Sequence, residues 1–133
     1  MSGITPHGAL FTMVRDDSLT GVDSIHFLKQ LLWRTGGKLL VIWDGSPIHR
    51  SKEVKAYLAD GAAKQIHLEQ LPGYAPELNP DEGTWEYLKH VELRNVCCLD
   101  LGDLHHELYL AIVRLRRKSW LIQSFFGEAG LAI

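Results

Sequence analysis

The chain has 133 residues, 46% of them hydrophobic, which suffices for one globular domain with a core of ordinary size. Its charged fraction is 23% and its formal net charge is -2, which excludes the strongly basic balance of a free-standing nucleic-acid-binding protein and restricts any DNA contact to local patches. There is neither a secretory signal nor a window near the roughly 18 apolar residues of a membrane span, so we expect a single domain over residues 1–133 in a soluble, cytoplasmic protein without membrane contacts.

The first part of the chain predicts a hairpin, a helix and a strand, in that order. Residues 1–14 hold two short apolar stretches around a tight polar turn, which favours a β-hairpin. Apolar residues at three- and four-residue steps predict an amphipathic helix over 22–33, ended by a glycine pair. The apolar run 38–43 is typical of a strand that is buried on both faces of a parallel sheet.

The second part of the chain predicts three helices and one more strand. A helix over 51–60 and a strand over 65–71 would complete a strand, helix, strand unit with the preceding strand. Asn79 followed by a proline has the chemistry of a helix start, so residues 80–90 should be helical. A long helix over 103–118 ends in basic residues, which suit the helix dipole. The pattern as a whole indicates an α/β fold.

Two carboxylates occupy positions where they could carry chemistry. Asp44 directly follows a strand at its C-terminal end, the edge at which open α/β sheets usually bind ligands. It could equally cap the polar turn that follows. Glu82 lies three residues after Asn79, where it could close a capping box instead of binding a ligand. Position alone leaves both interpretations open for each residue.

The string LPGYAPELNPDEGTWEYLK (71–89) closely resembles a segment of mariner-like DDE transposases. In that family a Pro-Tyr-x-Pro-x-Leu-Asn-Pro-x-Glu pattern leads to a Trp and a Leu-Lys pair. Here Gly73 stands between the proline and the tyrosine, and Glu82 occupies the place of the family glutamate. The tail SFFGEAGLAI also resembles the C-terminal end of the family.

The string VIWDGSPIHRSKEVKAYL (41–58) resembles the second-Asp segment of the same family, in which an Asp ends a strand and a His follows five residues later. These two residues are Asp44 and His49, and Gly45 stands where the family often has Asn. Glu82 follows Asp44 by 38 positions (82 minus 44), within the usual spacing of the family.

The resemblance implies a ribonuclease-H-like mixed sheet with flanking helices, in which three carboxylates hold two Mg²⁺ or Mn²⁺ ions. Asp44 would ligate one ion and Glu82 the other, since such cations prefer hard oxygen ligands. The implied reaction is metal-dependent cleavage of DNA at transposon ends, followed by strand transfer into target DNA. The implied partners are DNA and a second copy of the chain or a full-length transposase.

The first carboxylate of the family lies on the central strand, just before a hairpin, so we expect it upstream of Met1. Asp16, Asp17 and Asp23 follow the hairpin and occupy the wrong topological place to replace it. We therefore expect a sheet without its central strand, no helix-turn-helix domain, and little or no strand transfer by this chain alone. Strand edges left unpaired in this way favour self-association or instability. The sequence does not distinguish a decayed remnant from the downstream frame of a split gene.

Four basic residues are candidates for DNA contacts: His49, Arg50, Lys52 and Lys89. His49 could instead be a helix-start histidine or a contact in the metal shell beside Asp44. The others could simply form solvated helix faces. The adjacent cysteines Cys97 and Cys98 suit neither a disulfide framework nor a metal site, and we expect both to be reduced, buried thiols.

Two other functions are compatible with the sequence. A non-catalytic protein of this type could bind transposase or occupy DNA ends and so repress transposition. A stand-alone metal-dependent phosphohydrolase could use Asp44 and Glu82 with an unrelated third ligand, although no other feature indicates a small-substrate pocket.

Overall fold

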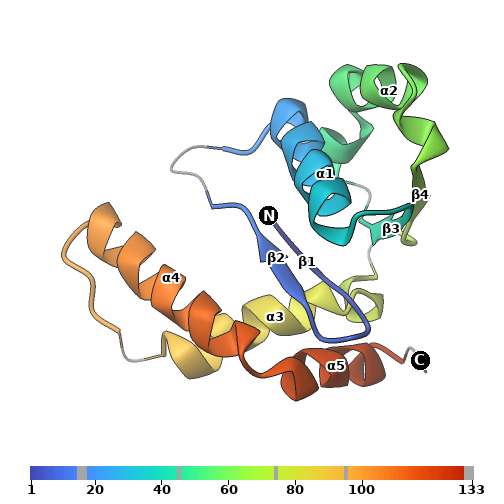
Figure 1. Cartoon of the computed structure of the whole chain (residues 1–133). Coiled ribbons are helices and arrows are strands. Elements are labelled where there is room, and N and C mark those ends of the chain that lie inside the picture. The colour runs from blue at the N-terminus through green and yellow to red at the C-terminus, as the bar shows by residue number, and fades with distance from the viewer. Residues whose placement is uncertain (15–17, 45, 74, 95, 131–133) are drawn as a thin grey trace. The chain divides into compact units, whose positions relative to one another are not determined.

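A computed structural model of the chain shows two compact units (Figure 1). Unit 1 comprises Met1 and Met13–Ala75, and unit 2 comprises Ser2–Thr12 with Pro76–Ile133. Whether the two units combine into the one predicted domain stays a prediction. Within these bounds the structure describes residues 1–14, 18–44, 46–73, 75–94 and 96–130.

Unit 1 contains the predicted order of helix, strand, helix and strand. Its elements are α1 (Gly21–Thr35), β3 (Leu39–Trp43), α2 (Lys52–Ala59) and β4 (Ile66–Gln70). β3 and β4 pair in parallel over five residues each, so the strand, helix, strand unit is confirmed. α1 ends at Gly36, whose φ of 70° is a left-handed conformation that glycine adopts without strain.

The core of unit 1 lies between the helices and one face of the sheet. α1 and α2 lie side by side (Figure 1), so closely that a Cβ on Gly21 would collide with the side chain of Ser51. Asp23 closes the start of α1, because its Oδ2 accepts a hydrogen bond of 2.8 Å from the Thr20 amide. Asp23 therefore serves as a helix cap, and Asp16 and Asp17 lie outside the described residues. The buried apolar side chains are Phe27, Leu28, Leu31, Val54 and Ile66.

The prediction that residues 38–43 are buried on both faces is wrong. Leu40 is 65% exposed and Ile42 is 53% exposed, whereas the alternate residues of β3 are half-buried. The physical reason is that one face of the sheet is covered and the other is not. Among the described residues β3 pairs with β4 alone, so its other edge is where the predicted self-association would form.

Unit 2 begins with the predicted hairpin and continues with helices. β1 (Ser2–Ile4) and β2 (Leu10–Thr12) pair antiparallel, and Gly8 in the turn has a φ of 93°. The predicted helix over 80–90 and the predicted helix over 103–118 are both present, the first continuing into a π-helical segment, η4. A C-terminal helix was not among the predicted elements. The helical segments are α3 (Asp81–Tyr87), η4 (Leu88–Glu92), α4 (Leu101–Arg116) and α5 (Ser119–Glu128).

The core of unit 2 joins the hairpin to the helices (Figure 1). The Arg116 guanidinium donates from Nε to the Leu10 carbonyl at 3.1 Å, which ties β2 to α4. A Cβ on Gly83 would lie 2.8 Å from the ring of Phe125, so glycine permits the close approach of α3 and α5. The buried cluster consists of Leu10, Leu88, Ala111, Ile112, Leu115, Ile122 and Phe125.

The described strands form two separate two-stranded sheets. The α/β class is confirmed, whereas the single mixed sheet of a ribonuclease-H-like fold stays a prediction. No helix in the described residues is long and apolar enough to cross a bilayer.

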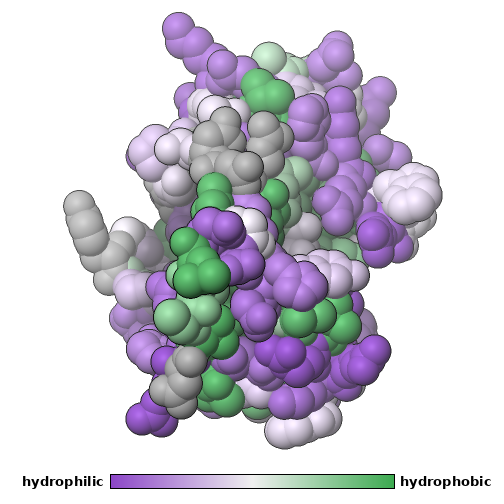
Figure 2. Space-filling model, turned by 90° about the vertical axis from the view of Figure 1, so that its left-hand side faces the viewer, coloured by the Kyte–Doolittle hydropathy of each residue, from purple (hydrophilic) through white to green (hydrophobic). Residues whose placement is uncertain are grey.

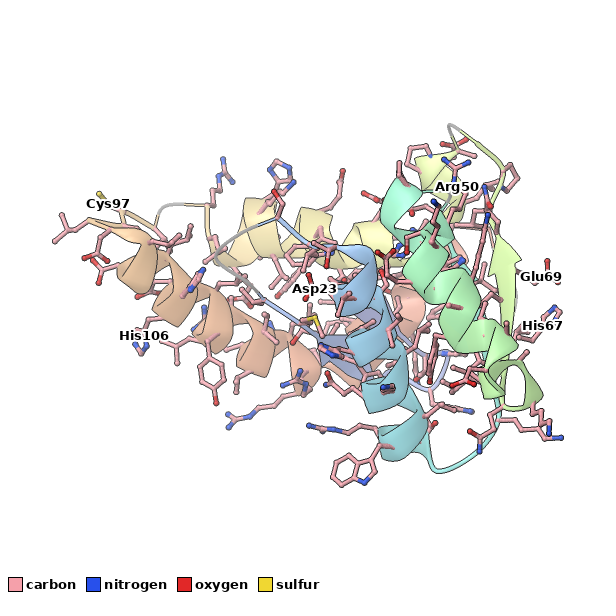
Figure 3. The ribbon with its side chains drawn as sticks, turned by 90° about the horizontal axis from the view of Figure 1, so that it is seen from above. Asp23, Arg50, His67, Glu69, Cys97 and His106 are labelled. Atoms are coloured by element: carbon pink, nitrogen blue, oxygen red, sulfur yellow. The ribbon has the colours of Figure 1, made fainter. Side chains whose placement is uncertain are left out.

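The prediction of buried cysteines is wrong. Cys97 is exposed and Cys98 is half-buried, and both are free thiols. Both lie between η4 and α4, outside the helices, and Figure 3 labels Cys97 in this segment. The same end of α4 exposes apolar side chains, as the view in Figure 2 shows, with Leu99 91% and Leu101 50% exposed.

Candidate functional site

Asp44 follows β3 directly, at the C-terminal end of the strand. Its Oδ1 accepts a hydrogen bond of 3.0 Å from the Ser46 amide, so the carboxylate does stabilise the turn, as one of the two interpretations expects. The side chain is nevertheless 58% exposed. Within the described residues both polar contacts of Asp44 are made by Oδ1, so Oδ2 can serve an external ligand.

His49 is the neighbour of Asp44 that the structure buries. It lies in η1 (Pro47–Arg50), its side chain is 13% exposed, and its ring stacks on Trp43 with centroids 4.2 Å apart. Nε2 lies 3.5 Å from Asp44 Oδ1, and Nδ1 lies 3.2 Å from the Ser24 hydroxyl. Burial lowers the pKa of His49, and the charge of Asp44 raises it by a smaller amount, so the imidazole is neutral at neutral pH.

Glu82 lies in the first turn of α3 and is exposed. The Asn79 side chain contacts the start of this helix, because its Oδ1 accepts a hydrogen bond of 3.1 Å from the Asp81 amide, although the helix begins at Asp81, one residue later than predicted. The Asn79 amide donates to the Pro76 carbonyl at 3.0 Å and not to Glu82, so the capping box does not form. The Glu82 carboxylate is therefore available to a ligand.

Asp81, the residue before Glu82, anchors α3 to the hairpin. Its Oδ2 accepts a hydrogen bond of 2.5 Å from the Ser2 hydroxyl, which in turn accepts one of 2.8 Å from the Trp85 indole. Burial raises the pKa of Asp81, although the hydroxyls of Ser2 and Thr84 favour its ionised form. The sequence did not indicate this anchor, because Ser2 and Asp81 are 79 positions apart in the chain.

The hydrogen-bonding capacity of Asp81 is only partly used. Its Oδ1 and the Thr84 hydroxyl are both buried, and neither has a hydrogen bond of good geometry within the described residues. A buried oxygen without a hydrogen-bond partner is unfavourable. The first turn of α3, which carries Glu82, is fixed by Ser2 and Trp85 in spite of this loss.

The two candidate metal ligands belong to different units. Asp44 lies in unit 1 and Glu82 in unit 2, so neither unit by itself defines the distance between them, and their shared site stays a prediction. Their chemistry fits Mg²⁺ or Mn²⁺, because both are exposed carboxylates and such ions prefer hard oxygen ligands. Within the described ranges, no three His, Cys, Asp or Glu side chains cluster closely enough to hold a metal.

The basic candidates are exposed where they could meet phosphates. Arg50 ends η1 and Lys52 begins α2 in unit 1, and Lys89 lies in η4 of unit 2 (Figure 3 labels Arg50). Their role in DNA binding stays a prediction. For His49, the burial of the ring and its approach to Asp44 favour a place in the metal shell over a direct phosphate contact.

The basic end of α4 is already engaged within unit 2. Arg114 donates from Nε to Glu92 Oε2 at 2.7 Å, and Lys118 donates to the Tyr87 hydroxyl at 2.8 Å. Lys118 also lies 3.7 Å from Glu92 Oε1. Glu92 thus neutralises part of the positive charge that the sequence places at this helix end.

Exposed carboxylates supply the hard oxygen ligands that Mg²⁺ prefers, and pairs of such ions serve phosphoryl transfer. The family model described as DDE superfamily endonuclease matches residues 1–104, a span that includes Asp44, His49 and Glu82. Neither a curated protein nor a solved structure matches the chain. The chain therefore belongs to the DDE superfamily endonucleases, a family of transposase-type nucleases.

Proposed function

We propose that this chain contributes to a mariner-like transposase that cleaves DNA at transposon ends and joins the freed 3′ ends to target DNA. The observation that carries the proposal is the family match across both carboxylate segments. The match to an endonuclease family favours catalysis over the non-catalytic repressor. A ribonuclease-H-like arrangement of the two units and assembly with a second transposase chain belong to the same proposal.

In this proposal Asp44 and Glu82 are the ligands of Mg²⁺ or Mn²⁺. The bound ions would supply the activation of the attacking oxygen and the stabilisation of the leaving oxygen in an in-line phosphoryl displacement. Asp44 would present its carboxylate from the end of β3, with Oδ1 held by the Ser46 amide. Glu82 would present its carboxylate from the first turn of α3, and a third carboxylate would be needed for the complete two-metal site.

The nucleic acid would be held by exposed positive charge. Arg50 and Lys52 follow Asp44 closely in the chain, so they would contact phosphates next to the carboxylate that meets the reacting phosphodiester. Lys89 would serve in the same way on the side of Glu82.

The test is the affinity of the chain for Mn²⁺, measured by electron paramagnetic resonance of the free ion. Loss of a contact to a metal ligand already costs roughly 10- to 100-fold in affinity, so Asp44→Asn and Glu82→Gln should each weaken binding at least tenfold. Asp60→Asn in unit 1 and Glu86→Gln in α3 remove exposed carboxylates of the same kind and should leave the affinity unchanged. Equal affinity in all four variants would refute the assignment of the ligands.

A further inference from the structure

His49 is surrounded by contacts that specify the orientation of its ring. The face stacks on Trp43 with an interplanar angle of 12°, Nδ1 faces the Ser24 hydroxyl, and Nε2 faces Asp44. Ser24 is itself fully buried in α1, 25 residues earlier in the chain. A histidine that only began a helix would need neither a buried hydroxyl nor an aromatic partner.

These contacts also select the position of the ring proton. In a neutral imidazole one nitrogen donates and the other accepts. Asp44 is a carboxylate that only accepts, so the nitrogen beside it must be the donor for the contact to be favourable. Ser24 can then donate its hydroxyl hydrogen to Nδ1, so the tautomer that carries the proton on Nε2 suits both neighbours.

We propose that His49 is a positioning residue that orients the Asp44 carboxylate for metal binding, with Ser24 fixing its tautomer and Trp43 fixing the plane of its ring. The inference rests on the proposed role of Asp44 as a metal ligand. The Ser46 amide donates to Oδ1 and Nε2 lies 3.5 Å from the same oxygen, which leaves Oδ2 as the oxygen that would be presented to the ion. At 3.5 Å the Nε2 contact is long, and it would shorten when the carboxylate binds a cation.

The alternative is that His49 only fills space between η1 and α1. Two substitutions separate these roles. The side-chain amide of glutamine can place an N–H group where Nε2 lies, whereas the amide of asparagine reaches only the place of Nδ1. If His49 orients Asp44, the variant His49→Gln should retain Mn²⁺ binding and His49→Asn should not. If His49 only fills space, no such order is expected.

The first measurement is the tautomer of His49 in the metal-free chain, from the ¹⁵N chemical shifts of the imidazole ring. We expect the proton on Nε2 in the wild-type chain and a mixture of tautomers in Ser24→Ala, with Ser18→Ala, an exposed serine outside this contact, as the control. A wild-type ring with its proton on Nδ1 would overturn the proposal, because Nε2 would then turn a lone pair toward the Asp44 carboxylate.

The second measurement is Mn²⁺ binding, followed by the paramagnetic broadening of the Asp44 amide signal. His49→Asn should weaken binding by about 10- to 100-fold, the usual effect of losing a partner of a metal ligand, and His49→Gln should recover most of it. His67→Gln is the matched control. His67 also pairs with a carboxylate, Glu69 at 2.6 Å, but both side chains project from β4 into solvent (Figure 3).

The outcomes distinguish this inference from the proposed function. If Asp44→Asn abolishes the broadening while His49→Asn and His49→Gln bind Mn²⁺ as the wild type does, Asp44 is a ligand and His49 does not position it. If Asp44→Asn itself leaves binding unchanged, the proposed function fails first. Thermal melting of both His49 variants accompanies the titrations, and equal melting with unequal Mn²⁺ affinity is the result that supports orientation.

Discussion

The surroundings of Asp44 in unit 1 are polar, whereas the segment that carries Glu82 in unit 2 is fixed largely by packing. The Ser46 amide and His49 both approach the Asp44 carboxylate itself. Glu82 is exposed on a helix whose next residue, Gly83, lies against Phe125. The orientation of Asp44 therefore depends on a few polar atoms, and the place of Glu82 depends on the core of unit 2.

The largest expected effect is on the packing beneath Glu82. Gly83→Ala places a methyl group 2.8 Å from the Phe125 ring, and overpacking of this kind destabilises by about 1 to 3 kcal/mol. Alanine recovers roughly 1 kcal/mol of this as the better helix former. Urea denaturation should therefore show a net loss of stability in unit 2.

Gly127→Ala in α5 is the matched control for this substitution. A Cβ at Gly127 meets no atom within 4 Å, so the alanine should stabilise by up to about 1 kcal/mol through helix propensity alone. If both alanine variants were equally stable, α3 and α5 would not approach as closely as the structure shows, and packing would not fix the place of Glu82.

The pH dependence of stability should distinguish Glu92 from Asp81, the two carboxylates at the ends of the segment from α3 to η4. Burial would raise the pKa of Glu92, but hydrogen bonds from Arg114 and Tyr87 and the charge of Lys118 hold it below its ordinary value of 4.5. A depressed pKa gives stability above pH 4.5 that is lost as the pH falls through the lower folded value. Glu92→Gln should thus show a shallower loss of stability in acid than Glu86→Gln.

Asp81 should behave in the opposite sense. Its raised pKa means that ionisation disfavours the folded state, and this penalty is present at neutral pH and disappears as the pH falls to its ordinary value of 3.8. Asp81→Asn should therefore increase stability at neutral pH, relative to wild type, by more than it does at pH 4. A gain that is the same at both pH values would show that the carboxyl does not titrate as described.

Short-range patterns predicted the helices and strands, and contacts between distant residues were not predictable in this way. The three- and four-residue steps of Leu28 and Leu31 identify α1, and the run to Trp43 identifies β3. The exposed face of β3 did not follow from its sequence, because an apolar run does not say whether a second layer covers it.

The candidate site shows the same difference between local motifs, which were predictable, and contacts between distant residues, which were not. Asp44 and Glu82 were predicted from local motifs, and their exposure agrees with a ligand role that stays a prediction. The contact of Ser24 with His49 was not predicted, since it depends on how α1 packs on η1. α5 was also missed, although Leu121, Ile122 and Phe125 have helical spacing, because that segment was interpreted by its resemblance alone.

A smaller effect should distinguish the charges near Asp44 from those elsewhere in unit 1. Each phosphate contact contributes about one to the slope of log affinity against log salt, so the double variant Arg50→Ala with Lys52→Ala should reduce the slope for duplex DNA by about two. Lys64→Ala is the control, because Lys64 is also exposed but precedes β4, at the opposite end of the sheet. If the double variant and Lys64→Ala gave the same slope, Arg50 and Lys52 would not belong to the DNA interface.

The central claim is that Asp44 and Glu82 ligate ions of one site, and Fe²⁺-directed backbone cleavage tests it most directly. Fe²⁺ that replaces Mg²⁺ generates hydroxyl radicals with ascorbate and peroxide, and these cut the chain only near the bound ion. We predict cuts next to both Asp44 and Glu82, with both sets lost in Asp44→Asn and in Glu82→Gln. If the cuts next to Asp44 persisted in Glu82→Gln, or those next to Glu82 persisted in Asp44→Asn, the two residues would not share a site.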